Sequence, residues 1–318
     1  MTPACRRISL SAAPVALTSL ALAFTAMAPT PAIAKQGDLV FDGSAWVGRS
    51  VVPPDVIDST PDQDRIQTDL GTSMRLSYDS GPVILRALAG ADVFPVESDY
   101  NRYRLGAEAQ YDLALADKGR VKLRLIPGFD YVFSNNGRVF DRYRIDGQLI
   151  MRHNREHTTT VRLRYGFRNQ CECTFRGYDQ SEWLGELRHF WRPGNGPTRI
   201  QGSLLGMHHD ADAQRFSYDG FGAQLIGRTA LTPKLDLYGR AYFAKRYYKA
   251  AFSNLYDFKR RDTQVRGTVG LEYAVARTYS LYAEGGYTNT DSNVPTRAYH
   301  GFIGQLGVRW NFLLAQGS

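Results

Sequence analysis

Period-two alternation of apolar and polar residues is the feature that most constrains this chain. It is clearest in one segment, where Val121, Leu123, Leu125, Phe129, Tyr131 and Phe133 alternate with Lys122, Arg124, Gly128 and Asp130. Successive side chains of a β-strand point to opposite faces of the sheet, so the pattern predicts one apolar and one charged face. In a closed sheet that crosses a membrane, the apolar face meets lipid and the charged face lines the lumen.

Similar segments recur along the chain, and we count about fourteen, each near the length that a tilted strand needs to cross a bilayer. They are predicted at residues 39–52, 65–78, 83–93, 103–113, 120–133, 139–151, 159–167, 182–192, 199–209, 216–231, 234–248, 262–275, 278–289 and 299–312. Short turn-forming joints alternate with generally longer polar loops. Short turns belong to the periplasmic side of such barrels, so an even strand count predicts that both termini are periplasmic.

These segments predict an all-β fold, a transmembrane antiparallel up-and-down β-barrel of about fourteen strands in the outer membrane of a Gram-negative bacterium. A soluble β-sandwich is the alternative, but its strands usually have about 5–6 residues. The charged inner faces would also make a poor dry core, because each buried charge needs a partner. Aromatic residues near the predicted strand ends fit the interfacial girdles of a barrel: Trp46, Tyr111, Tyr247, Tyr248, Tyr287 and Trp310.

The first residues resemble a secretory signal. Arg6 and Arg7 precede an uncharged apolar stretch, and Ala32-Ile33-Ala34 supplies the small residues of a cleavage site. We therefore expect a cleaved signal peptide at residues 1–34 and a barrel domain at residues 35–318. An uncleaved membrane anchor is the alternative, but the apolar run is short.

The net charge of +8 is modest, and the basic residues alternate with apolar ones inside strands instead of forming a tail or a helix face. This distribution argues against nucleic-acid binding. Cys171 and Cys173 are the cysteines of the expected mature chain. Extended residues at this spacing seldom form an unstrained disulfide, so we expect no disulfide framework.

The predicted lumen carries charges of both signs. Its main candidate residues are Arg104, Glu108, Arg124, Asp130, Arg142, Arg144, Arg162, Arg164, Arg266, Glu272, Glu284 and Arg309. Two interpretations compete for them: a lattice of arginine–carboxylate pairs that stiffens the wall and partly fills the lumen, or a net positive pore that favours anions. Interspersed acids, among them Glu108 beside the level of Arg124 and Glu284 near Arg266, favour the lattice.

Other chemistry has little support in the sequence. His208, His209, Asp210 and Asp212 could hold a metal at the outer rim, but a solvated loop edge explains them as well. No local motif brings together a nucleophile, a base and an orienting group. We expect neither an enzyme nor a cofactor.

The last strands carry a resemblance to a known family. Residues 287–295, with the sequence YTNTDSNVP, lead to Tyr299 and to a final strand that ends in Gly307-Val308-Arg309-Trp310-Asn311-Phe312. This text resembles the C-terminal barrel domain of surface lipoprotein assembly modifier proteins. The resemblance covers about fifty residues and implies a role in moving lipoproteins or related cargo to the cell surface. We expect no helical-repeat domain before the barrel, and in this the chain would depart from the family.

The sequence thus predicts a barrel that acts in transport across the outer membrane, with a structural or surface-interaction barrel as the alternative. The expected partners are outer-membrane lipids, the machinery that inserts barrels by reading the aromatic C-terminal strand, and an exported lipoprotein or protein cargo.

Overall fold

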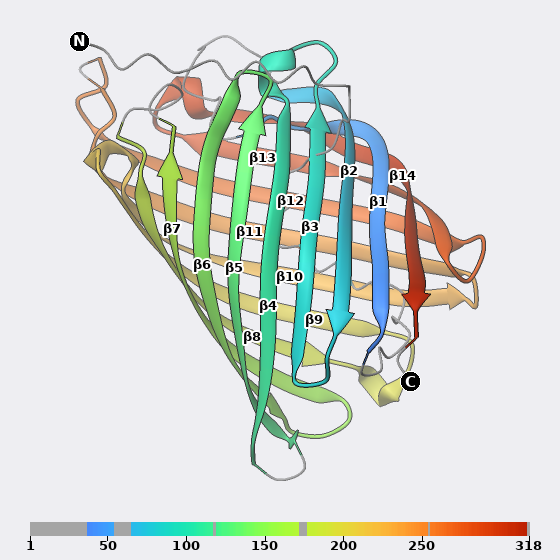
Figure 1. The fold of residues 1–318 in the computed structure, drawn as a ribbon. Coiled ribbons are helices and arrows are strands. Elements are labelled where there is room, and N and C mark those ends of the chain that lie inside the picture. The colour runs from blue at the N-terminus through green and yellow to red at the C-terminus, as the bar shows by residue number, and fades with distance from the viewer. Residues whose placement is uncertain (1–36, 54–64, 117–118, 172–176, 254, 317–318) are drawn as a thin grey trace.

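The chain folds into a closed antiparallel β-barrel (Figure 1). The computed structural model describes residues 37–53, 65–116, 119–171, 177–253 and 255–316. The predicted signal peptide lies outside these residues. The described part of the chain has no helix long and apolar enough to cross a membrane.

Fourteen strands form the barrel, and each pairs with its neighbours in sequence until β14 closes the sheet on β1. Their bounds are β1 (Leu39–Val51), β2 (Ile66–Asp79), β3 (Val83–Val93), β4 (Arg102–Ala116), β5 (Val121–Ser134), β6 (Gly137–Arg152), β7 (His157–Gln170), β8 (Gln180–Trp191), β9 (Arg199–Ala211), β10 (Tyr218–Thr232), β11 (Leu235–Ala251), β12 (Lys259–Ala274), β13 (Tyr279–Ser292) and β14 (Tyr299–Ala315). The predicted fold class, strand number and approximate strand positions are confirmed.

Short 3₁₀ helices interrupt four of the connections. They are η2 (Ser98–Tyr100), η4 (Pro193–Asn195), η5 (Gln214–Phe216) and η6 (Pro295–Arg297). The prediction that a strand begins at Phe216 is wrong, because this residue ends η5 and packs against Tyr178 with ring centroids 4.7 Å apart. The hydrogen-bonded ladder of β10 starts two residues later.

Side chains alternate between the two faces of the barrel wall, apart from bulges such as the one between Ala114 and Ala116. On one face, large apolar residues such as Leu105, Tyr143, Leu163 and Val269 are more than half exposed. On the other face lie the charged residues, including pairs that reach across an intervening strand, as Glu108 of β4 reaches Arg144 of β6. Such contacts form on the concave side of a sheet. The apolar face is therefore the outer, lipid-facing wall and the charged face is the lumen.

Two aromatic residues depart from the girdle predicted for them. The indole of Trp46 lies on the inner face, where its Nε1 donates to Asp69 Oδ2 at 2.9 Å. The ring of Tyr248 is also on the inner face, 4.5 Å below the guanidinium of Arg260. Residues near the end of a strand lie on both faces of the barrel, so an aromatic residue near an end can face the lumen as well as the lipid. Tyr111, Tyr247, Tyr287 and Trp310 do lie on the outer face.

Candidate functional site

The structure places every candidate lumen residue of the sequence analysis on the inner face of the wall. Strand register explains this placement, because residues paired across two strands share a face: Arg142 faces Asp130 and Arg168, for example. The residues separate into two groups on opposite walls. One group occupies β3 to β8 and the other β10 to β14.

The first group forms a continuous network, here called the β3–β8 lattice. Its members are Arg86, Arg104, Glu108, Asp130, Arg142, Arg144, Asp146, Arg162, Arg164, Arg168, Glu182, Glu186 and Arg188. Asp130 of β5 is one hub. It is 0% exposed and lies 2.5 Å from Arg104 Nη2, 2.8 Å from Arg142 Nη2 and 3.3 Å from Arg144 Nε.

Asp146 of β6 is the second hub of the lattice. Arg162 Nε lies 2.5 Å from its Oδ1, Arg164 Nε lies 3.1 Å from the same oxygen, and Arg144 Nη1 lies 3.7 Å from Oδ2. Arg162 continues to Glu186 Oε2 at 3.2 Å. Arginine suits such bridging, because its planar guanidinium offers five donors in a fixed fork. Each carboxylate is therefore shared by two or three guanidiniums on neighbouring strands.

The partners within the lattice differ from the predicted ones. Glu108 pairs with Arg86 at 3.0 Å and Arg144 at 3.1 Å, whereas the sequence analysis placed Arg124 beside it. Arg124 instead forms a bidentate pair with Asp112, both contacts being 2.7 Å. The alternation fixes the face of each side chain, but the partner depends on the register between strands.

The second group centres on Glu272 of β12. Arg228 Nη1 lies 3.1 Å from its Oε2, Arg309 Nη1 contacts the same oxygen, and Ser280 donates to Oε1 at 2.5 Å. Arg309 also lies over the ring of Tyr282, 4.1 Å from its centroid. Here too one carboxylate serves several donors.

Arg240 and Arg266 extend this cationic wall toward the middle of the barrel. They project inward from adjacent strands, with Thr268 opposite Arg240 and Thr288 opposite Arg266. Glu284 of β13 interacts electrostatically with both guanidiniums. Nε of Arg266 has no hydrogen-bond partner among the described residues. Two cations thus face one carboxylate at this level.

The lumen as a whole is basic. Along the described strands, arginine and lysine side chains on the inner face outnumber aspartate and glutamate. Asp130, Asp146 and Glu272 are each shared among two or three guanidiniums, so the ion pairs do not cancel the surplus. A low-dielectric wall concentrates the field of unbalanced charge in the space that it encloses. The arrangement can attract anions.

At the loop end of the lumen, the structure shows a cluster of arginines and tyrosines that the sequence analysis did not include among its candidate residues. Arg246 lies over Tyr218, 5.8 Å from the ring centroid, and Arg260 pairs with Asp262 at 2.6 Å while it covers Tyr248. Tyr218 also stacks on His209 at 4.3 Å. The sequence did contain a signal for this cluster: Arg246, Tyr248, Arg260 and Asp262 all stand at even-numbered positions, as the other inward residues of their strands do.

The histidine pair at residues 208 and 209 is divided between the two faces of β9. His208 is on the outer face, with Nδ1 2.5 Å from Asp219 Oδ1, whereas His209 is on the inner face. Adjacent strand residues cannot converge on one ion, and the described residues contain no group of three suitable metal ligands. Cys171 is disulfide-bonded, whereas the sequence analysis expected no disulfide framework. Cys173 and Cys5 lie outside the described residues.

Comparisons with known proteins support the fold. No family model matches the chain, and no curated protein matches its sequence. Among solved structures, a bacterial polysaccharide outer membrane secretin has a TM-score of 0.52 at 10% identity, covering 88% of this chain and all of that one. The outer membrane channel DcaP of Acinetobacter baumannii gives 0.48 at 9% identity, covering 87% and 96%. A loop-deletion form of OmpT of Vibrio cholerae gives 0.47 at 12% identity, covering 87% and 100%. The likeness to the secretin supports the fold of outer-membrane β-barrels, and an identity this low carries no further conclusion.

Proposed function

We propose that the chain is an outer-membrane conduit whose lumen favours anionic solutes. The observation that carries the proposal is the surplus of inward cations over inward carboxylates, on walls where carboxylates such as Asp130 and Glu272 are each shared among several guanidiniums. Rings of arginine and lysine select for anions in pores of this kind. Because arginine stays protonated at any physiological pH, the preference does not depend on a titrating group.

The wall surrounding this lumen is suited to the outer membrane. Its outer face carries large exposed apolar residues from every part of the barrel, among them Leu105, Leu204, Phe302 and Leu306. One end has short turns, such as residues 80–82 and 233–234, and the other end has generally longer connections, with the turn at 135–136 as the exception. In outer-membrane barrels the short turns face the periplasm. We therefore place both termini in the periplasm.

A structural barrel is a second candidate, and the β3–β8 lattice favours it. Ion pairs that bridge six adjacent strands would hold that wall together whether or not solute passes. A third candidate, export of surface lipoprotein or protein cargo, rests on the resemblance of residues 287–312 to the surface lipoprotein assembly modifier barrel. A strain that lacks the gene and shows unchanged surface lipoproteins would exclude that role.

Ion selectivity in planar bilayers separates the conduit from the structural barrel. With a KCl gradient across the bilayer, we expect channel events and a reversal potential of the sign that marks chloride preference. Replacing Arg240 and Arg266 together by glutamine should shift that potential toward zero. Arg261→Gln is the matched control, because Arg261 belongs to β12 as Arg266 does but lies on the outer face. Absence of current, or a cation preference in the unmodified protein, would contradict the proposal.

A further inference from the structure

Glycines form a row across the outer wall of the barrel. Gly227 of β10 pairs with Gly239 of β11, and the same hydrogen-bonded level continues through Val269 to Gly285 of β13. A Cβ atom at Gly227 or Gly285 would meet nothing within 4 Å, and one at Gly239 would meet only ordinary contacts. These positions therefore point away from the protein, toward lipid, and leave the wall thin along one line.

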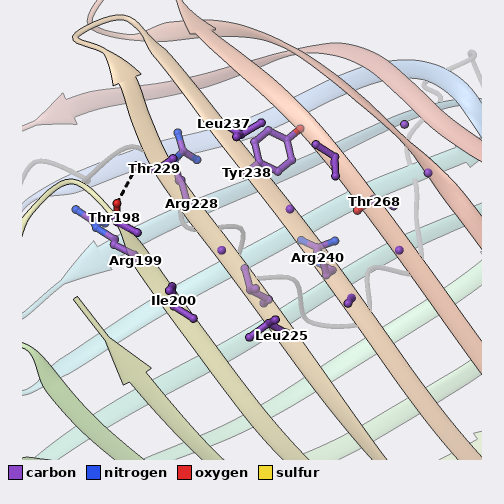
Figure 2. A pocket seen from close by; sticks show the side chains of 18 residues that line it. Thr198, Arg199, Ile200, Leu225, Arg228, Thr229, Leu237, Tyr238, Arg240 and Thr268 are labelled. Atoms are coloured by element: carbon purple, nitrogen blue, oxygen red, sulfur yellow. Dashed lines mark hydrogen bonds between the residues drawn. The ribbon is translucent and has the colours of Figure 1, made fainter. Parts of the chain in front are cut away.

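A groove of about 600 Å³ follows this row (Figure 2). Val269 stands on the row itself, between Gly239 and Gly285, so the open floor of the groove lies over Gly227 and Gly239 and continues to Ala241 and Gly267. Ile200, Leu225 and Leu237 stand around that floor. The floor is backbone, and the walls are aliphatic. Such a trough is narrow and apolar, so its occupant must be slender and apolar as well.

The groove lies in the half of the wall nearer the short turns. Ile200 is the second residue of β9, and Leu237 is the third residue of β11. The Oγ1 atoms of Thr198 and Thr229 lie 2.9 Å apart at the short-turn end of the groove, where the dashed line in Figure 2 joins them. Because short turns mark the periplasmic side, this half of the wall meets the phospholipid leaflet of the outer membrane.

Along the same level of strand pairing, the outer wall continues from the groove to a group of polar residues at its edge, here called the rim. Ile200 pairs with Trp191 of β8, and Trp191 pairs with His157 of β7. The ring of His157 is stacked on Trp191 at 6.2 Å with an interplanar angle of 7°, and its Nδ1 lies 3.1 Å from Nε2 of His189. Tryptophan on the outer wall is typical of headgroup depth.

The rim is rich in nitrogen donors. His153 lies beside His189 with ring centroids 6.4 Å apart, and the adjoining turns contribute Arg155 and Arg192. Glu156, also in the turn, is the acid of this stretch. Guanidinium and imidazole groups outnumber that acid, and such donors bind phosphate oxygens well.

We propose that the groove and the rim together bind one phospholipid of the inner leaflet, with an acyl chain in the trough over Gly227 and Gly239 and an anionic headgroup at the His157–His189 rim. A second copy of the chain fits the trough poorly, because a barrel wall is broad and convex whereas the trough is narrow. The outer-leaflet glycolipid is on the opposite side of the bilayer from the rim.

Native mass spectrometry of the full-length protein, purified in a mild detergent and supplied with phosphatidylglycerol, tests the proposal. The groove variant Gly227→Leu/Gly239→Leu fills the trough, and we expect retention of the lipid to fall about tenfold, since several buried methylenes lose their contacts. Gly185→Leu/Gly206→Leu is the matched control. These two glycines are also paired on the outer wall with open space above them, but they do not line the groove. The control should retain lipid as the unmodified protein does.

A second comparison addresses the headgroup. In the double variant His189→Ala/Arg192→Gln, the preference for phosphatidylglycerol over phosphatidylethanolamine should disappear while the trough stays open. Heat-modifiable migration on a gel verifies that each variant is folded. Equal lipid retention by the groove variant and its control would overturn the proposal. A groove variant that instead changes the oligomeric mass would overturn it in favour of a second copy as the occupant.

Discussion

Arg142 and Asp130 form the pair around which the inner wall is organised: Arg142 Nη2 donates to Asp130 Oδ2 at 2.8 Å, and Asp130 is fully buried. The same carboxylate accepts from Arg104 and Arg144. One side chain of β5 thus joins β4 and β6. A buried carboxylate with three guanidiniums is stable only as a set, because each charge depends on the others for its solvation.

Asp130→Asn should therefore destabilise the barrel. Three guanidiniums would then surround a neutral amide instead of a charged carboxylate. Removal of one partner of a buried ion pair typically costs about 3–5 kcal/mol. The measurement is urea-induced unfolding in detergent micelles, followed by heat-modifiable migration. Asp219→Asn is the control, since the Asp219 side chain is 62% exposed on the outer wall and should change stability little. Equal unfolding midpoints for the two variants would mean that the hub contributes nothing.

Trp46 and Gly71 give a second prediction. A Cβ at Gly71 would lie 2.2 Å from the indole of Trp46, so the ring covers the glycine on the inner face of β2. Gly71→Leu should displace the indole, break its hydrogen bond to Asp69 and expose it in the lumen. A red shift of the tryptophan emission and a lower unfolding midpoint are the expected results. Gly202→Leu, on the outer wall with open space above it, should leave both unchanged.

The alternation made most of the fold predictable. Because the side-chain period of a strand is two, Val121 and Lys122 take opposite faces wherever the strand begins or ends. The strand positions and the face of residues such as Arg142 and Glu284 follow from that rule alone. The aromatic residues do not follow it so simply. Trp46 and Tyr248 lie in the lumen because their positions in the alternation outweigh their nearness to strand ends.

Partner choice could not be predicted in the same way. Arg124 meets Asp112, and Glu108 meets Arg86 and Arg144, because the register between strands fixes which residues share a level. A bulge between Ala114 and Ala116 changes that register within β4. The glycine row has the same origin. Gly227, Gly239 and Gly285 are far apart in the sequence, and only the register places them on one line.

Asn101 holds the loop between β3 and β4, and its replacement gives a third prediction. Its Oδ1 accepts the backbone N–H of Phe94 at 2.7 Å, and Phe94 packs with Tyr100 and Val52 in a buried cluster. Asn101→Ala leaves that N–H buried without this partner, which costs about 1–3 kcal/mol. The loop should then be cleaved faster by a protease added to intact cells, while the barrel stays folded. Unchanged cleavage would show that the apolar cluster alone orders the loop. Asn289→Ala is the control, because Asn289 is exposed on the outer face of β13, away from this loop.

The orientation of the barrel gives the last prediction. Asn136 lies in the turn between β5 and β6, and Asn195 lies in η4 between β8 and β9, at the opposite end of the wall. Both side chains are exposed, so a cysteine at either position is accessible from its own side of the membrane. The turn at 135–136 is short but lies at the end of the barrel where the other connections are longer. With the end that carries the turns at 80–82 and 233–234 facing the periplasm, a membrane-impermeant maleimide should label Asn136→Cys on intact cells and Asn195→Cys only after the outer membrane is opened. Cys171 is disulfide-bonded and should not react. The reverse labelling pattern would invert the barrel, place the termini outside and move the glycine groove to the other leaflet.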